Sequence, residues 1–368
     1  MVGGTSACCN ISAICSKLVA SKLATPPMLN SYYQPHIPVS ASIGVVLPTL
    51  NCAHLLSDHL DSMQPWLDLV EQIVVVDSHS DDGTWEMLQK RLAEHPRATF
   101  HQRPRGLYQS WNFGISQLET DFTYVSTVGD SITREGLEHL SDVAAEFEAD
   151  VVVSKPIFVE EDGGVCSHQT IWPVDDIFRT LKIDQPAVLS VWETLLFQIV
   201  NPVDAILGSS ASNLYRTDKL RIMPFPTEFG TVGDGAWGLK NAFAYRLAVT
   251  PKSFSTFRRH VKAYSKSEYK VADLNHRLFE LLHSNLSQGI GESPQRRLEA
   301  DSLDCNKIVE TVQRRMHWQR RLEDVRTARL PWIFNPCAWQ ARTMRNLYRA
   351  KALSQRDAAL GKASLHGF

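Results

Sequence analysis

The 368-residue sequence predicts an α/β protein with a mainly parallel sheet flanked by helices and a helical extension at its C-terminal end. Apolar, β-branched runs alternate with amphipathic stretches over about 110 residues, a pattern typical of βαβ units. Beyond residue 265 the apolar residues recur at helical spacing, which favours helices alone. The composition fits a folded globular protein, because 43% of the residues are hydrophobic and 21% are charged.

The first half of the chain has the clearest elements. Ile43–Leu47 is apolar and β-branched and is followed by Pro48, so it is predicted to be a buried strand. His54–Leu69 has apolar residues at helical spacing and is predicted to be a helix. By the same two patterns we expect strands at 73–76, 98–101, 122–126 and 151–153, and helices at 84–94, 110–118 and 134–148.

The second half has a looser pattern. Residues 192–200 are predicted to be helical, and the glycine-rich residues 230–238 around Asp234 are interpreted as a loop. Val271–Leu282 has one apolar face, and a second helical stretch covers about 303–329, because a proline at 331 stops it.

Charge is distributed unevenly along the chain. The sequence has 38 Lys and Arg against 40 Asp and Glu, and this formal charge of −2 argues against a nucleic-acid-binding protein. Residues 314–356 nevertheless carry +9, which leaves −11 for the remainder, and they interleave aromatic types that settle at membrane headgroups. The segment predicts peripheral contact with an anionic membrane. The alternative is a helical appendage whose arginines pair with the acidic body and whose tryptophans are core.

The cysteines and the hydropathy of the sequence indicate where in the cell the protein is expected to lie. Seven cysteines are scattered without a CxxC pair, which is neither a zinc-site spacing nor a disulfide framework. We therefore expect reduced thiols and a cytoplasmic location, at the inner face of the membrane if the basic segment binds there. No apolar run approaches the roughly 18–20 residues of a spanning helix. Residues 1–41 are expected to be a disordered leader, and Met28 is a candidate for the true start.

Polar residues follow three of the predicted strands. Thr49 and Asn51 follow the first strand, Asp77 follows the second, and Asp130 follows the fourth. In a parallel sheet such ends meet at one edge, where ligands bind. No GxGxxG or GxxxxGK[ST] loop follows the first strand, so the sequence lacks the phosphate cradle of dinucleotide-binding and P-loop proteins.

Four segments in order resemble family 2 glycosyltransferases, the inverting nucleotide-sugar enzymes of the GT-A fold. They are PTLN at 48–51, VVVDSHSDDGT at 74–84, GLYQSWNFGI at 106–115 and VGD at 128–130, the last similar to a relaxed metal-binding motif. The resemblance covers about residues 42–262. It implies a GT-A domain over 42–265, with a nucleotide-sugar half at 42–155 and an acceptor half at 156–265. A basic helical extension then occupies 266–368.

The resemblance implies a donor site at the strand ends. Asp77 would accept hydrogen bonds from a ribose hydroxyl or a base N–H, and Asp130 would hold Mn²⁺ or Mg²⁺ against the diphosphate. A turn role for Asp77 and a helix-capping role for Asp130 remain the alternatives. The nucleotide-sugar-binding residues expected on this basis are Pro48, Thr49, Asn51, Asp77, Ser78, Asn112, Gly129 and Asp130.

The acceptor half must supply a base. Inversion needs a carboxylate that takes the proton from the acceptor hydroxyl, and Asp234 lies where the family places an acidic pair, with Gly233 in place of its Glu. Trp237 and Ser210 are expected on the acceptor side, although a core tryptophan and a polar turn are the alternatives. The resemblance also makes His260 a candidate second metal ligand.

The function predicted from these residues is inverting transfer of a sugar from a nucleotide diphosphate sugar to a glycan or lipid-linked hydroxyl, in polysaccharide biosynthesis. A non-catalytic nucleotide-sugar-binding scaffold is the main alternative, because the metal motif is relaxed and Gly233 replaces an acid. A sugar-1-phosphate nucleotidyltransferase would share the sheet. It would need a glycine-rich basic loop after the first strand, where PTLN stands instead.

Overall fold

The eight-stranded central sheet has the order β3-β2-β1-β4-β9-β6-β10-β8, and a small second sheet has the order β5-β11-β7. The computed structural model describes residues 41–169, 172–200, 206–207, 209–259, 271–326 and 336–366. The predicted leader at 1–41 therefore lies outside the described residues except for its last residue. His260 also lies outside them. The strands are β1 (Ile43–Thr49), β2 (Val70–Asp77), β3 (Ala98–Gln102), β4 (Phe122–Val125), β5 (Ser131–Ile132), β6 (Val151–Val153), β7 (Ile157–Val159), β8 (Ala187–Leu189), β9 (Asn213–Arg216), β10 (Leu247–Val249) and β11 (Ser255–Arg258).

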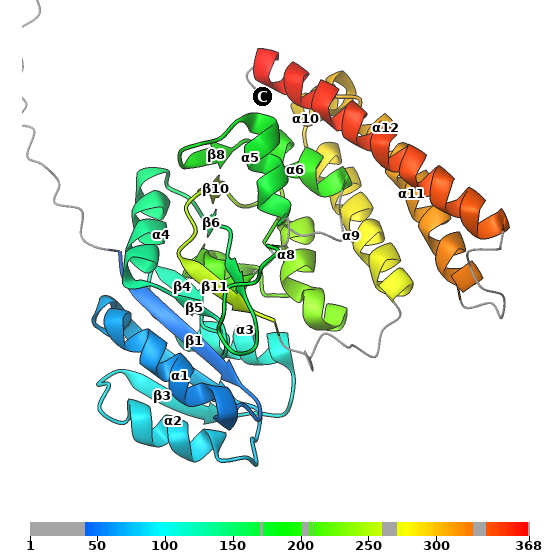
Figure 1. Ribbon diagram of the computed structural model, residues 1–368. Helices are drawn as coiled ribbons and strands as arrows, with labels where there is room; N and C mark the ends of the chain where they lie inside the picture. The colour runs from blue at the N-terminus through cyan, green and yellow to red at the C-terminus, as the bar shows by residue number, and fades with distance from the viewer. Residues whose placement is uncertain are drawn as a thin grey trace, which may run out of the picture. The chain divides into compact units, whose positions relative to one another are not determined.

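Helices cover both faces of the sheet, as Figure 1 shows. The 3₁₀ helices are η1 (Gln64–Leu69), η2 (Ser210–Ser212) and η3 (Thr227–Val232). The α-helices are α1 (Ala53–Met63), α2 (Thr84–Leu92), α3 (Leu107–Gln117), α4 (Arg134–Glu146), α5 (Pro173–Leu181), α6 (Val191–Val200), α7 (Thr217–Ile222), α8 (Gly233–Asn241), α9 (Val271–Gly291), α10 (Pro294–Ser302), α11 (Cys305–Arg326) and α12 (Pro336–His366).

The strands form a mainly parallel sheet, which confirms the predicted fold class. The pairs β1–β2, β2–β3, β1–β4 and β6–β10 are parallel, whereas β9 and β8 run antiparallel to their neighbours. Neighbouring residues of a strand face opposite ways, so Val45 packs beneath α1, α2 and α4 while Val46 packs against α3. Two hydrophobic layers therefore enclose the sheet.

Three sequence predictions are corrected. The helix predicted over 54–69 ends at Met63 and continues as the 3₁₀ helix η1, whose first turn contains Pro65. The glycine-rich stretch at 230–238 is helical from Gly233 onward, because packing against neighbouring elements outweighs the low helix propensity of glycine. The stretch predicted over 303–329 begins as α11 at Cys305, after a separate α10.

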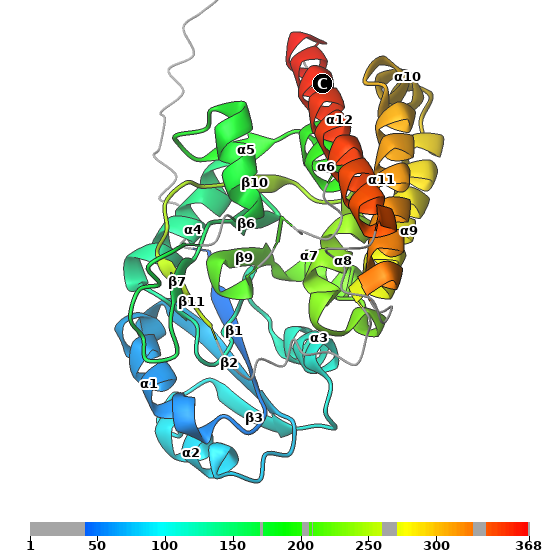
Figure 2. The same ribbon diagram turned by 45° about the vertical axis from the view of Figure 1, so that its right-hand side comes forward.

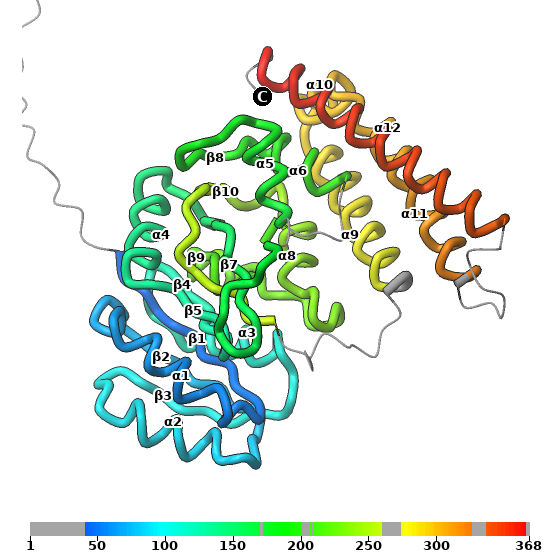
Figure 3. The backbone as a smooth tube through the Cα atoms, viewed as in Figure 1, coloured from blue at the N-terminus to red at the C-terminus, as the bar shows by residue number. Residues whose placement is uncertain are grey.

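The C-terminal helices pack on the rest of the fold. Helices α11 and α12 lie side by side, and both contact α6 (Figures 2 and 3). Their inward residues, such as Ile308, Ala352 and Leu360, belong to the same hydrophobic cluster as α3 and α8. No helix of the described residues is both long and apolar enough to cross a membrane.

Candidate functional site

The carboxyl ends of β1 and β2 surround a buried carboxylate. Asp77 is fully buried and pairs with Thr49 in the strand register. Its Oδ1 accepts hydrogen bonds from Thr49 Oγ1 at 2.9 Å and Ser80 Oγ at 2.6 Å, and its Oδ2 accepts from the Ser80 backbone N–H at 2.8 Å. Asp77 thus organises the loop after β2. Its direct contact with the donor stays a prediction.

The loop after β1 is tied to the loop after β2. Asn51 adopts a left-handed conformation with φ 47°, its N–H donates to Ser80 Oγ at 2.9 Å, and its side-chain oxygen accepts from Asp81 N–H at 3.0 Å. The Ser78 N–H donates to the Thr49 carbonyl at 2.9 Å. Pro48 lies opposite Val76 in the sheet. These contacts bring the expected donor-site residues of both strands to one edge of the sheet.

Asp130 lies in a tight turn between β4 and β5. Gly129 has φ 103°, a conformation that favours glycine. Asp130 Oδ2 accepts from Thr127 Oγ1 at 2.9 Å, and Oδ1 accepts from the Arg258 backbone N–H at 2.9 Å. Burial raises the pKa of Asp130 to about 7, although these two hydrogen bonds and the Arg258 charge oppose the shift.

His59 of α1 holds this turn, a role that the sequence reasoning missed. Its side chain is 4% exposed, with Nδ1 2.9 Å from the Asp130 carbonyl oxygen and Nε2 3.0 Å from Ser126 Oγ. A carbonyl only accepts, so Nδ1 carries the proton and Nε2 accepts from the serine hydroxyl. Burial lowers the pKa of His59 to about 4 and keeps the ring neutral. A histidine among the apolar positions of a predicted helix was the available signal.

Asp234 lies in the first turn of α8. The Gly235 backbone N–H donates to its Oδ1 at 2.7 Å. Burial raises the pKa of Asp234 to about 6, and the hydrogen bond from the Gly235 N–H partly opposes that shift. A carboxyl group with this pKa is charged at neutral pH, yet it is far more basic than an ordinary aspartate. The arrangement suits proton abstraction.

Tyr108 explains the glycine before Asp234. A Cβ built on Gly233 would meet Tyr108 Cδ2 at 2.4 Å and the Pro226 carbonyl oxygen at 2.7 Å. The Tyr108 ring is 2% exposed, and its hydroxyl donates to the Thr231 carbonyl at 3.2 Å. The acid that resemblance places at position 233 therefore has no room in this fold.

Three residues that were expected to contact the donor or the acceptor are buried or hydrogen-bonded within the protein. Both ends of the Asn112 amide bond the Phe225 backbone, with Nδ2 donating to its carbonyl at 2.8 Å and Oδ1 accepting from its N–H at 2.9 Å. Ser210 is 5% exposed in η2. Trp237 is fully buried, donates to the Met223 carbonyl and stacks on Tyr245. The acceptor-side position expected of Trp237 is corrected, because the indole is a core residue with no free face.

The turn around Asp130 can hold a divalent cation, provided that substrate oxygens complete its coordination. Each carboxylate oxygen of Asp130 already accepts one hydrogen bond, and a carboxylate offers about four lone-pair sites. Mg²⁺ is commonly held by one or two carboxylates together with substrate phosphates. Within the described residues no group of three or more His, Cys, Asp or Glu side chains forms a metal cage. The donor set fits a cation that arrives with a diphosphate.

The fold of this chain is similar to that of solved structures. The crystal structure of S. aureus TarS 1–349 in complex with UDP-GlcNAc matches with a TM-score of 0.51 and 16% identity, covering 89% of this chain and 92% of that chain. The mannosyltransferase PcManGT from Pyrobaculum calidifontis, in complex with GDP-Man and Mn²⁺, matches with a TM-score of 0.45 and 17% identity, covering 89% and 76%. The match to TarS, together with the mainly parallel eight-stranded sheet, shows that the architecture is the GT-A fold.

The family follows from the sequence. Residues 44–205 match the model of glycosyl transferase family 2. The chain therefore contains a glycosyltransferase domain of family 2, as the four motifs predict, and the protein is a glycosyltransferase. No curated protein matches the chain in a sequence comparison.

Proposed function

We propose that this protein is an inverting glycosyltransferase that uses a nucleotide diphosphate sugar, with Asp234 as general base and Asp130 as the metal-holding carboxylate. One observation carries the proposal. Among the described residues, Asp130 and Asp234 are the carboxylates whose pKa burial clearly raises. Perturbed carboxylates concentrate at functional sites. The motif comparison selects the same two residues from the sequence.

The proposed reaction needs two separate carboxylates. Asp234 takes the proton of the acceptor hydroxyl while that oxygen attacks the anomeric carbon from the face opposite the diphosphate. The new C–O bond forms as the bond to the diphosphate oxygen breaks, and the nucleoside diphosphate leaves with the electron pair. A cation at Asp130 would neutralise charge on the departing diphosphate. Asp77 and Asn51 shape the loops on the donor side through the contacts described above.

The experiment that tests this proposal separates binding from turnover. Turnover and thermal shift are measured with Mn²⁺ and a panel of nucleotide sugars, and the preferred donor is then titrated into the variants. Asp234→Asn is expected to retain donor affinity but to lose about 10²–10⁴-fold in turnover. Asp130→Asn is expected to lose the Mn²⁺-dependent part of donor affinity. Exposed Asp142→Asn on α4 is the matched control and should leave both unchanged.

Three results would contradict the proposal. Turnover of Asp234→Asn within a few-fold of the wild type would place the base elsewhere. Unchanged Mn²⁺-dependent affinity in Asp130→Asn would remove the metal role. Absence of any turnover with intact donor binding would favour the non-catalytic scaffold.

We also propose that the acceptor is a glycan or a lipid-linked molecule and that the protein acts in polysaccharide biosynthesis.

We further propose that the protein is cytoplasmic and that its residues 314–356 contact an anionic membrane. The outward face of α12 supports the last point. Trp339 and Leu347 are 55% and 56% exposed there, Lys351 is exposed one turn beyond Leu347, and Arg349 is also exposed on this helix. No acidic residue occurs between 336 and 356. Exposed aromatic and basic residues on one helix suit the headgroup region.

A further inference from the structure

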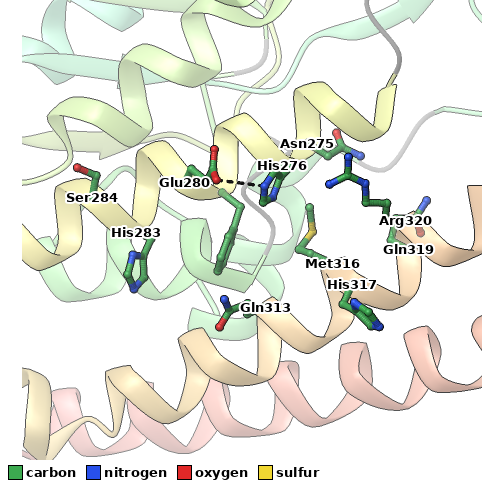
Figure 4. Close-up of a pocket in the computed structure, with 11 residues that line it drawn as sticks. Asn275, His276, Glu280, His283, Ser284, Gln313, Met316, His317, Gln319 and Arg320 are labelled. Carbon is green, nitrogen blue, oxygen red and sulfur yellow. Dashed lines mark ion pairs between the residues drawn. The ribbon is translucent and has the colours of Figure 1, made fainter.

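A cavity of about 520 Å³ lies between α9 and α11, away from the strand ends of the sheet. Figure 4 shows that α9 contributes Ser284, His283 and Glu280 to it, while Gln313 and Met316 point toward them from α11. Its volume falls within the about 300–1,000 Å³ of small-molecule sites. None of the residues assigned to the donor or to proton transfer lines it.

The cavity combines an apolar floor with polar walls. Phe279 is 5% exposed and, with Met316, supplies the apolar surface. The ring of His283 is inclined by 27° to that of Phe279, with 6.3 Å between the two ring centroids. Gln313 and Ser284 add an amide and a hydroxyl. Amide, hydroxyl and imidazole groups each both donate and accept hydrogen bonds, so the walls suit a ligand whose own groups do both.

These features select among ligand classes. An isolated metal ion does not fit, because no group of three ligating side chains forms among the described residues. A simple ion is not selected, because the walls carry both signs: Glu280 Oε1 lies 3.1 Å from His276 Nε2, and the Arg320 guanidinium also lines the cavity. A wholly apolar ligand would leave the polar walls unpaired. A sugar ring fits, because its C–H face can cover the apolar floor while its hydroxyls meet the walls.

Helix α9 links this cavity to the segment that carries the base. On another face of α9, the Asn285 side chain donates to the Leu239 carbonyl of α8 at 2.8 Å. The Arg277 guanidinium donates to the Glu228 carbonyl of η3 at 2.9 Å and lies over Phe229. Since η3 leads directly into the first turn of α8, the cavity wall and Asp234 belong to one packed assembly.

We infer that the cavity between α9 and α11 binds sugar units of the acceptor glycan that are remote from the reacting hydroxyl. The inference rests on the proposed function, since it supposes that the acceptor is an oligosaccharide chain. Binding there contributes equally to the ground and transition states. Loss of the site should therefore raise KM for long acceptors and leave kcat unchanged.

Direct binding without donor provides the test. The full-length protein is applied to a printed array of defined oligosaccharides of two to six units, and the strongest ligand is titrated calorimetrically. Ser284→Trp places an indole in the cavity, and Ser287→Trp is the matched control, because both serines are exposed on α9 and Ser287 does not line the cavity. Ser284→Trp should weaken oligosaccharide binding at least tenfold. Ser287→Trp should change oligosaccharide affinity less than twofold. Both variants should have the melting temperature and the donor affinity of the wild type.

The outcomes separate this inference from the proposed function. No bound oligosaccharide, or equal affinity in the two tryptophan variants, would overturn the inference. Asp234→Asn should keep full oligosaccharide affinity while losing turnover. If that variant keeps turnover while Ser284→Trp loses oligosaccharide binding, the base assignment fails and the cavity assignment stands.

Discussion

At the scale of single residues, the space beside the proposed base is filled by Tyr108. Its ring occupies the position that a side chain at 233 would take, so Gly233 is required by close packing rather than by an unusual backbone conformation. Asp234 consequently lacks an acidic neighbour at 233. Burial raises its pKa, and the hydrogen bond from the Gly235 N–H partly offsets that shift.

Gly233→Ala should destabilise the protein by about 1–3 kcal/mol, because the new methyl group forces the Tyr108 ring or the Pro226 carbonyl to move. Urea unfolding measures the change. Gly361→Ala is the control, since nothing lies within 4 Å of its Cβ position in α12, and alanine there should stabilise the helix by up to about 1 kcal/mol. Equal stability of Gly233→Ala and the wild type would show that Tyr108 moves freely.

The raised pKa of Asp234 predicts a pH dependence of turnover. A base must be ionised, so turnover should rise about tenfold per pH unit below about 6 and level off above it. A pH profile of kcat with the preferred donor measures this. A flat profile between pH 5 and pH 7 would mean that the ionisation of Asp234 does not limit turnover.

The same shift makes a prediction for stability. The folded-state pKa of about 6 exceeds the ordinary aspartate value of 3.8, so Asp234 destabilises the fold progressively as pH rises from about 4 to 6. The asparagine of Asp234→Asn stays neutral, so the free energy of unfolding of this variant should rise by about 1–2 kcal/mol relative to the wild type over that interval. This figure already allows for the partial exposure of the side chain. Urea unfolding at pH 4 and pH 8 gives the two differences. A constant difference would contradict the raised pKa.

At the scale of elements, a buried ion pair joins α12 to α5. The Arg356 side chain is 3% exposed, pairs with Asp176 and lies over the Phe197 ring of α6. Burial alone would raise the pKa of Asp176, but hydrogen bonds and charges of Arg356 and Arg179 lower it overall. At this point, therefore, an arginine of the basic segment is paired with the acidic body.

Arg356→Met should cost about 2 kcal/mol at pH 7, because it leaves a partly buried Asp176 with the exposed Arg179 as its remaining ion-pair partner in the described structure. The depressed pKa of Asp176 stabilises the fold above about 4, and that contribution is lost as pH falls further. The difference between variant and wild type should therefore shrink toward pH 3. Exposed Arg349→Met on the same helix is the control. A variant that matches the control at pH 7 would show that the pair adds nothing.

At the scale of the whole molecule, the C-terminal helices divide their residues between the core and the surface. Arg356 and the inward apolar residues join the body, whereas Trp339, Leu347, Arg349 and Lys351 remain outward. Deleting the helices would expose the core that they cover. Membrane contact is therefore better tested by surface substitutions than by truncation.

The variant Trp339→Gln/Arg349→Gln/Lys351→Gln should bind anionic vesicles more than tenfold more weakly than the wild type, since each basic residue near such a surface contributes about 1 kcal/mol. Sedimentation with phosphatidylserine-containing and neutral vesicles measures this, and added salt should weaken the wild-type binding. Lys90→Gln/Lys252→Gln, two exposed lysines elsewhere, is the matched control. Equal sedimentation of the triple variant and the wild type would end the membrane proposal.

The sequence by itself determined the alternation of strands and helices in the first half, because burial on both sheet faces imposes a local pattern of apolar residues. It also determined the family and the position of Asp77 at the end of β2, and it led to the predicted roles of Asp130 and Asp234. In the second half the strands β7 to β11 have only three or four residues each, too few to leave a periodic signal.

Only the tertiary structure decided what surrounds these carboxylates. The contacts of His59 with the Asp130 turn, of Arg258 with Asp130, and of Tyr108 with Gly233 beside Asp234 join residues 71, 128 and 125 positions apart. Local periodicity carries no information about such distant partners. For the same reason, Trp237 could not be assigned to the core until the packing of Tyr245 and Met223 against it was known.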